Sequence, residues 1–217
     1  MRYLLSLILT TLICMTAAAQ NATNGEFQCG ELYYKICQPG KKDVEVVRHS
    51  AEYKKLNQIS VPDKITVGQT QYKVVKIGDG AFMGCTNLKS VKIGSQIKEI
   101  GEYAFDGCTS LSSIQIPKSV KKIGDLAFEK CSSLKQVSLQ KGLVHIGSGS
   151  FGYCTALKEI YIPASVKTIE AEAFYGCTSL TTARLSKKTK YTDSGTYSND
   201  DEFEYSAFDE GVEIILY

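Results

Sequence analysis

The chain of 217 residues has no tryptophan, only four prolines and two histidines, and almost no excess of charge of either sign. Lysine and arginine number 25 against 23 acidic residues, and both signs are spread through the sequence. This balance argues against a nucleic-acid binder that works by counterion release. The lack of tryptophan weakens a sugar-stacking site, although tyrosine can take its place. Beyond the leader described next, no apolar run approaches the roughly 18 residues that cross a bilayer, which excludes a multi-spanning membrane protein.

Residues 1–19 have the features of a secretory signal peptide. Arg2 precedes an apolar stretch from Leu4 to Met15, and Ala17–Ala19 provides a cleavage site. Cys14 follows an isoleucine rather than a small residue, so we expect ordinary cleavage in preference to lipidation. The protein is then expected to be exported, to the periplasm, the cell surface or the medium.

The rest of the sequence repeats with a period of 23 residues, and this period decides the fold class. Five cysteines keep the step: Cys85, Cys108, Cys131, Cys154 and Cys177. Five phenylalanines keep it too: Phe82, Phe105, Phe128, Phe151 and Phe174. A single unit buries too few apolar side chains to offset the entropy of ordering it, at about 1.5 kcal/mol per residue. The units must therefore stack into a solenoid, and we expect Phe128 to pack between Phe105 and Phe151.

Each unit predicts one strand, a second short extended segment and a compact turn. In one unit, alternation places Ile114 and Ile116 inward and Gln115 outward. Residues 120–123 form the second extended piece, and residues 127–128 fit a single helical or 3₁₀ turn. One coil of the solenoid thus has a strand on one side and a compact turn on the other.

The consensus L-x-x-I-x-I-P-x-x-V-x-x-I-G-x-x-A-F-x-x-C-x-x runs from about Leu56 to Leu185. It closely resembles the BspA-like, or Treponema pallidum type, leucine-rich repeats of secreted and surface bacterial proteins. The resemblance implies a leucine-rich-repeat solenoid, a curved right-handed stack with a β-strand and a short helical or 3₁₀ turn in each 23-residue coil. It also implies export by an anaerobic, Bacteroidetes-like bacterium. Some relatives are described as adhesins for host proteins or other cells, and many have no assigned function.

The irregular ends are expected to cap the stack, since an open solenoid would expose apolar core and strand edges. Two β-hairpins are expected near the N-terminus, one from residues 32–37 and 44–47 and one that turns at Gly68. Residues 212–217 are expected to close the other end as a final strand. The expected regions are a signal peptide (1–19), an N-terminal capping region with hairpins and one irregular repeat (20–76), regular repeats (77–186), and a polar insertion with a C-terminal cap (187–217).

The cysteines allow several interpretations. The five repeat cysteines cannot converge on one metal ion, and five side chains that point the same way cannot all pair, so we expect a ladder of buried thiols. Cys29 and Cys37 differ, because they lie eight residues apart across an expected turn and are candidates for a disulfide. The acids of the insertion do not follow calcium-loop spacing, which favours a solvated loop over a calcium site. These acids are Asp193, Asp200, Asp201 and Glu202.

Catalytic residues are scarce. The two histidines, His49 and His145, lie in no H-E-x-x-H, G-x-S-x-G or Cys-His arrangement. His145 occupies a position that tolerates other residue types in other repeats, which indicates a solvated side chain. Asp79, Glu102 and Asp125 form an acidic column that could serve a glycosidase, but their place at the entry of the short turn favours a structural role. We therefore expect no enzyme, no cofactor and no metal.

What remains for function is the surface. Strands that stack about 4.8 Å apart give a ribbon about 20 to 25 Å long, which suits a protein segment or a polymer. The candidate ligand-binding face is the outward side of the strands: Lys92, Gln115, Ser138, Glu159, Tyr161, Thr182 and Arg184. Tyr161 and Arg184 are of the types enriched at binding hot spots. Lys98, Lys121 and Lys167 form a column that could attract acidic partners or could be a solvated face.

Together these features predict an exported, non-catalytic, adhesin-like protein. We expect a monomer that binds a host extracellular protein, a bacterial surface protein or a glycan, with no nucleic acid and no membrane span. Two alternatives stay open: a structural or envelope-associated spacer without a dedicated ligand and, less favoured, an enzyme that acts on polysaccharide.

Overall fold

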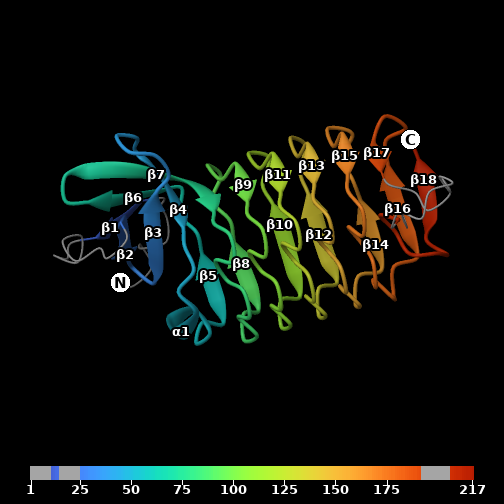
Figure 1. Cartoon of the computed structure of the whole chain (residues 1–217), viewed down its shortest axis with the longest axis horizontal. Coiled ribbons are helices and arrows are strands. Elements are labelled where there is room, and N and C mark those ends of the chain that lie inside the picture. The colour runs from blue at the N-terminus through green and yellow to red at the C-terminus, as the bar shows by residue number, and fades with distance from the viewer. Residues whose placement is uncertain (1–10, 15–24, 192–205) are drawn as a thin grey trace, which may run out of the picture.

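The computed structural model describes residues 11–14, 25–191 and 206–217 (Figure 1). Four residues of the expected leader form strand β1 (Thr11–Cys14), which pairs in parallel with β6 (Lys64–Val67). The rest of that leader lies outside the described residues. So do the insertion acids Asp193, Asp200, Asp201 and Glu202.

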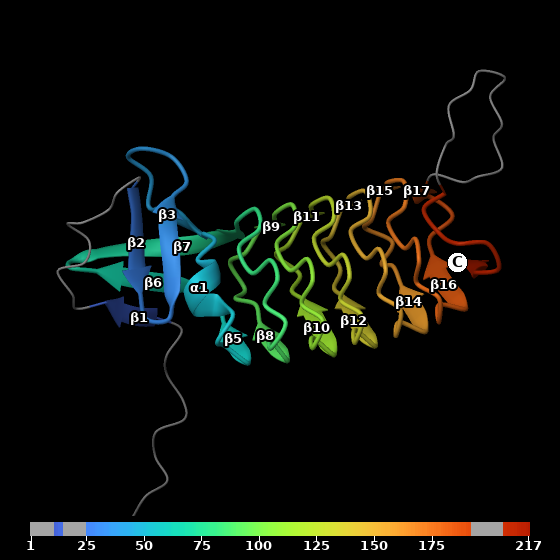
Figure 2. The same cartoon turned by 60° about the horizontal axis from the view of Figure 1, so that its bottom comes forward.

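Each regular coil contributes two strands, which form two columns along the long axis of the molecule (Figures 1 and 2). The face strands are β8 (Ser90–Lys92), β10 (Ser113–Ile116), β12 (Gln136–Leu139), β14 (Glu159–Tyr161) and β16 (Thr182–Leu185). The short strands are β9 (Glu99–Ile100), β11 (Lys122–Ile123), β13 (His145–Ile146), β15 (Thr168–Ile169) and β17 (Lys190–Tyr191). The predicted alternation in β10 is confirmed, because Ile114 and Ile116 are 3% and 0% exposed and Gln115 is exposed.

The two columns differ in continuity. The short strands pair in parallel, in register, within one long sheet that continues through β7 (Thr70–Ile77) to the N-terminal strands. The face strands instead form three separate groups: β5 (Gln58–Ser60) with β8, β10 with β12, and β14 with β16 and β18 (Glu213–Leu216). The ladder on the face is therefore interrupted between β8 and β10 and again between β12 and β14.

The N-terminal part has the two expected hairpins. Strands β2 (Glu26–Cys29), β3 (Leu32–Ile36) and β4 (Asp43–Val46) are antiparallel neighbours, and β4 lies parallel to β7. Strands β6 and β7 form the second hairpin around Gly68. The helix α1 (Ser50–Tyr53) connects β4 to β5. At the other end of the stack, β18 extends the face strands beside β16.

A column of stacked phenylalanine rings runs through the core. The ring centroids of Phe105, Phe128, Phe151 and Phe174 lie 5.1 to 5.3 Å apart with interplanar angles of 3 to 7°, and all four are fully buried. This confirms that Phe128 packs between Phe105 and Phe151. Beside the rings, four of the five repeat thiols, from Cys108 onward, donate to the carbonyl of a phenylalanine in the preceding coil, as Cys131 Sγ does to Phe105 O at 3.3 Å. The repeat cysteines thus form the expected ladder of buried thiols.

The compact side of each coil is a run of tight turns, which corrects the expected helical or 3₁₀ turn. Two positions in every coil have left-handed φ angles of 54 to 71°. They are the columns Gly80, Tyr103, Leu126, Gly149, Glu172 and Gly84, Gly107, Lys130, Tyr153, Gly176. A helix needs negative φ throughout, so none can propagate. Alternate backbone amides point to the next coil instead, as Phe82 N–H donates to Ala104 O of that coil at 2.8 Å.

The acidic column has a structural role here. Asp125 Oδ1 accepts a hydrogen bond from the Ser148 amide in the next coil at 3.0 Å. Asp79 Oδ1 accepts one from the Glu102 amide in the same way, at 3.2 Å. These carboxylates therefore satisfy backbone donors of the neighbouring coil, where the turn leaves them without a helical partner.

The structure does not form the candidate disulfide. Cys29 is opposite Leu32 at one end of β3, whereas Cys37 follows the other end of that strand. A strand rises about 3.3 Å per residue, so the two residues lie beyond the roughly 7 Å limit for a disulfide. Cys37 is an exposed free thiol. The short spacing predicts proximity, but the turn occupies only residues 30–31, directly after Cys29, and the other intervening residues form β3.

Alkylation should distinguish these environments. Partial burial, together with Glu45 and Asp43, raises the pKa of Cys37 to about 11, while burial raises that of Cys131 to about 12. We expect a maleimide to label Cys37 in the folded chain, with a rate that rises about tenfold per pH unit below its pKa because the thiolate is the nucleophile. The five repeat thiols should stay unlabelled, as peptide mass mapping would show. Stoichiometric labelling of Cys131 without denaturant would contradict the buried ladder.

Candidate functional site

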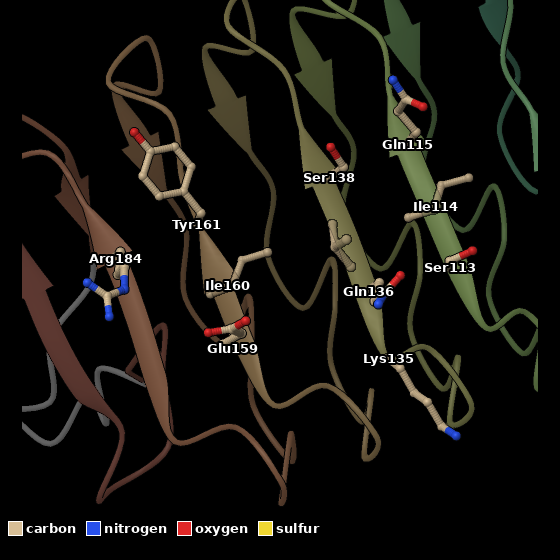
Figure 3. A pocket seen from close by; sticks show the side chains of 11 residues that line it. Ser113, Ile114, Gln115, Lys135, Gln136, Ser138, Glu159, Ile160, Tyr161 and Arg184 are labelled. Atoms are coloured by element: carbon tan, nitrogen blue, oxygen red, sulfur yellow. The ribbon is translucent and has the colours of Figure 1, made fainter.

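The face strands carry a groove of about 570 Å³ at the interruption between β12 and β14 (Figure 3). It is lined by Ser113, Ile114, Gln115, Lys135, Gln136, Val137, Ser138, Glu159, Ile160, Tyr161 and Arg184. The first and third residues of each face strand point outward, because successive residues of a strand alternate. Its volume falls within the range of about 300 to 1,000 Å³ that is usual for ligand sites.

Most of the predicted face residues meet at this groove. Five of the seven line it: Gln115, Ser138, Glu159, Tyr161 and Arg184. Lys92, on β8, and Thr182, on β16, do not. The sequence pattern identified the outward positions but not the hollow, since the interruption of the ladder leaves no trace in the period.

The shape of the groove follows from one column of side chains. In register, Gln115 lies opposite Ser138, and Tyr161 lies opposite Arg184. Ser138 is small and stands between the larger Gln115 and Tyr161, so the space above it stays open (Figure 3). All four side chains of this column are exposed.

Tyr217 does not line the groove but supports Tyr161, which does, and the sequence analysis missed this contact. Its ring stacks on Tyr161 with centroids 5.4 Å apart and planes 6° apart. Its hydroxyl donates to Ile162 O at 2.8 Å and its amide to Leu185 O at 3.1 Å. Tyr217 lies outside the repeat frame, so no spacing signal pointed to it. It packs against one face of the Tyr161 ring.

The Tyr217 hydroxyl stays protonated at any physiological pH. Partial burial and the neighbouring Tyr161 hydroxyl raise the pKa of Tyr217 to about 12. The hydrogen bond to the Ile162 carbonyl therefore does not depend on pH in that range. The aromatic wall of the groove is fixed before any ligand arrives, which lowers the entropic cost of binding.

The charges of the groove have no partners among the described side chains. Glu159, Arg184 and Lys135 take part in none of the ion pairs found in the described ranges. Glu159 lies in register with Thr182 rather than with Arg184. The carboxylate and the guanidinium are thus held apart on neighbouring strands. Both are available to a ligand, and Arg184 can bind a carboxylate through two parallel hydrogen bonds.

Neither histidine reaches the groove. His49 stacks on Tyr33, with ring centroids 3.6 Å apart, at the N-terminal end. His145 is half-buried on β13, where Nδ1 lies 2.8 Å from Thr168 Oγ1, so it is less solvated than expected. Within the part of the chain that the structure describes, no group of three His, Cys, Asp or Glu side chains could hold a metal ion. No helix in that part is long and apolar enough to span a bilayer.

The chain is similar to known bacterial repeat proteins. Residues 75–204 match the BspA type leucine-rich repeat region in six copies. The leucine-rich repeat protein TpLRR of T. pallidum is 32% identical, and the match covers 71% of this chain and 69% of that one, with a TM-score of 0.65. No curated protein sequence matches significantly.

Two further solved structures share the fold alone. The pneumococcal vaccine antigen PcpA is 22% identical over 77% of this chain and 51% of that one, with a TM-score of 0.60. A leucine-rich repeat protein of Eubacterium ventriosum is 20% identical over 76% and 42%, also with a TM-score of 0.60. The repeat period, the stacked coils and the match over more than half of the sequence agree, and the chain belongs to the BspA-type leucine-rich repeat family.

Proposed function

We propose that this chain is an exported, non-catalytic, adhesin-like protein that binds a protein on a host or bacterial surface through its face strands. It acts as a monomer and needs no cofactor. The observation that carries the proposal is the groove, in which Tyr161, Arg184 and Glu159 stand together, exposed and without an ion-pair partner among the described residues. Membership of a leucine-rich repeat family supports a binding role.

The chemistry of the groove suits a protein partner. Antibody paratopes combine rigid tyrosine contacts, arginine anchors and small polar or amide side chains that adapt their hydrogen bonds. The groove has the same composition: Tyr161, Arg184, Ser113, Ser138, Gln115 and Gln136. Tyr161 and Arg184 stand on strands rather than loops, so little backbone freedom is lost on binding.

One feature weighs against an enzyme acting on polysaccharide. Glycosidases use a pair of carboxyl groups, and Glu159 is the single carboxylate among the residues that line the groove. A spacer without a ligand would not need two unpaired charges beside an exposed, stacked tyrosine.

We also propose that the chain is divided into the four regions expected from the sequence: a leader (1–19), an N-terminal cap (20–76), the repeats (77–186) and a C-terminal cap (187–217). The antiparallel strands β2 to β4 beside β7 support the first cap. The parallel pairing of β18 with β16 supports the second.

A binding screen tests the proposal. The mature chain would be presented to host extracellular proteins, bacterial surfaces and glycan arrays, and the partner found would be titrated against variants. We expect Tyr161→Ala and Arg184→Ala each to weaken binding by at least about fivefold, because truncating a desolvated hot spot costs over about 1 kcal/mol.

Matched controls lie on the turn side of the molecule. Tyr175 is a tyrosine of similar exposure, 46% against 52% for Tyr161, and Lys130 is an exposed cation. Tyr175→Ala and Lys130→Ala should bind like the parent. Equal affinity of all four variants and the parent would move the site away from the face, and failure to bind any surface would favour a spacer.

A further inference from the structure

Eight exposed lysines gather along one edge of the solenoid, away from the groove. The loop flank is the set of connections from each face strand to the next short strand, residues 93–98, 117–121, 140–144, 162–167 and 186–189, together with residue 190, which begins β17. Its lysines are Lys98, Lys118, Lys121, Lys141, Lys167, Lys187, Lys188 and Lys190. Only three of them, in one column, stand out from the sequence alone.

The backbone holds these lysines in register from coil to coil. Lys121 N–H donates to Lys98 O, and Lys190 N–H donates to Lys167 O, both at 2.8 Å. Val144 occupies the middle coil and links the two pairs through the same ladder. Neighbouring strands lie about 4.8 Å apart, so this column spans about 19 Å from the first lysine to the last.

The connections of the flank hold no charge of opposite sign, since none of the five contains an aspartate or a glutamate. Asp63 reaches the first of them, where it accepts a hydrogen bond from Ser95 Oγ at 3.0 Å. Glu99, which borders the first connection, is engaged by Lys76 at 3.5 Å. Among the described residues, none of the eight lysines belongs to an ion pair. Like charges on adjacent strands destabilise a sheet, so the flank gains stability from an external anion.

We propose that the loop flank binds a linear acidic polysaccharide, a chain of sugars bearing carboxylate or sulfate groups, laid along the solenoid axis. The charge repeats along a line rather than around a pocket, which matches a polymer rather than a single anion. Lysine ammonium groups on long flexible stems can follow anions of irregular spacing, whereas arginine is favoured for fixed bidentate geometry. This site is separate from the groove, and the polysaccharide is a different partner from the protein that the groove binds.

Other polyanions fit the flank less well. Single-stranded nucleic acid binds through aromatic side chains on which bases stack. Of the exposed tyrosines in the described residues, Tyr103, Tyr153 and Tyr175 lie on the turns and Tyr161 on the face. Tyr217 borders the flank, but one side of its ring is stacked on Tyr161. An anionic membrane is engaged by exposed apolar side chains beside the basic ones. The flank itself presents none of the exposed large apolar side chains found in the described ranges.

Direct binding measurements test this site. Biosensor titration of the mature chain would compare heparin, polygalacturonate, neutral dextran, single- and double-stranded DNA, and phosphatidylcholine–phosphatidylserine vesicles. We expect binding to one or both acidic polysaccharides, none to dextran, and weakening as NaCl rises from about 50 to 200 mM, because counterions compete. Heparin and polygalacturonate distinguish sulfate from carboxylate as the preferred group.

A charge-matched pair of variants locates the site. Lys121→Gln/Lys167→Gln should lower the affinity at least about tenfold and flatten the salt dependence. The control, Lys89→Gln/Lys158→Gln, removes two exposed lysines at the opposite ends of the face strands and should stay within about twofold of the parent. Circular dichroism would show that both variants fold.

Three results would overturn the assignment: equal losses in both double variants, tighter binding to DNA or vesicles than to either polysaccharide, or no polysaccharide binding at low salt. None of them bears on the groove, whose partner is tested by Tyr161→Ala and Arg184→Ala. The two proposals can therefore fail separately.

Discussion

Replacing Phe128 with alanine is expected to destabilise the protein by about 3 to 5 kcal/mol. The ring is fully buried and stacks on both sides, 5.1 Å from Phe105 and 5.2 Å from Phe151. Its removal leaves a cavity that cannot close, because the hydrogen bonds between coils hold the backbone in place. For a chain of this size we expect the Tm to fall by roughly 6 to 20 °C, as calorimetry would measure.

An exposed aromatic residue supplies the control. Tyr175 is 46% exposed on the turn side, so Tyr175→Ala should change stability by less than about 1 kcal/mol. A Tm for Phe128→Ala within about a degree of the parent would disprove the stacked core.

The second large loss of stability is expected when a charged residue replaces Ile116 in β10. Ile116 is fully buried in β10, and Ile116→Asp would bury a carboxylate without a partner. We expect a loss of about 4 to 5 kcal/mol or more, enough to prevent cooperative folding. Expression of the mature chain and its far-ultraviolet circular dichroism would show the loss.

The preceding residue is the matched control. Gln115 points outward and lies opposite Ser138, with no acid in register. Gln115→Asp introduces the same carboxylate one position away, and we expect a change within about 0.5 kcal/mol. Similar behaviour of the two variants would mean that β10 does not alternate between core and solvent.

Much of the fold follows from the period, since residues 23 apart must occupy equal places in a stack. The phenylalanine column, the thiol ladder and the inward Ile114 and Ile116 could all be predicted for that reason. The left-handed positions could not. Tyr103, Leu126 and Lys130 take φ values of 54 to 57°, which glycine usually supplies, so their residue types conceal the turns.

The candidate site was predictable only in outline. Alternation identifies Tyr161 and Arg184 as outward, but the hollow in front of Tyr161 depends on where the ladder is interrupted, between β12 and β14. That interruption arises from packing between coils of equal length and leaves no mark in the repeat. Tyr217 reaches Tyr161 across β16 from an irregular terminus, a contact that no spacing rule describes.

The in-register ladders have a consequence for how such a molecule can change. Each coil is held by bonds to its immediate neighbours, as Phe105 N–H donates to Ala127 O and Gly124 N–H to Ile100 O. Gain or loss of one whole unit by recombination preserves every column, whereas an insertion within a strand shifts the residues that follow it out of register. The protein can therefore vary in length by about 4.8 Å per unit. Each added unit lengthens the column of face strands and the lysine flank together, while the exposed residues on both surfaces remain free to diverge.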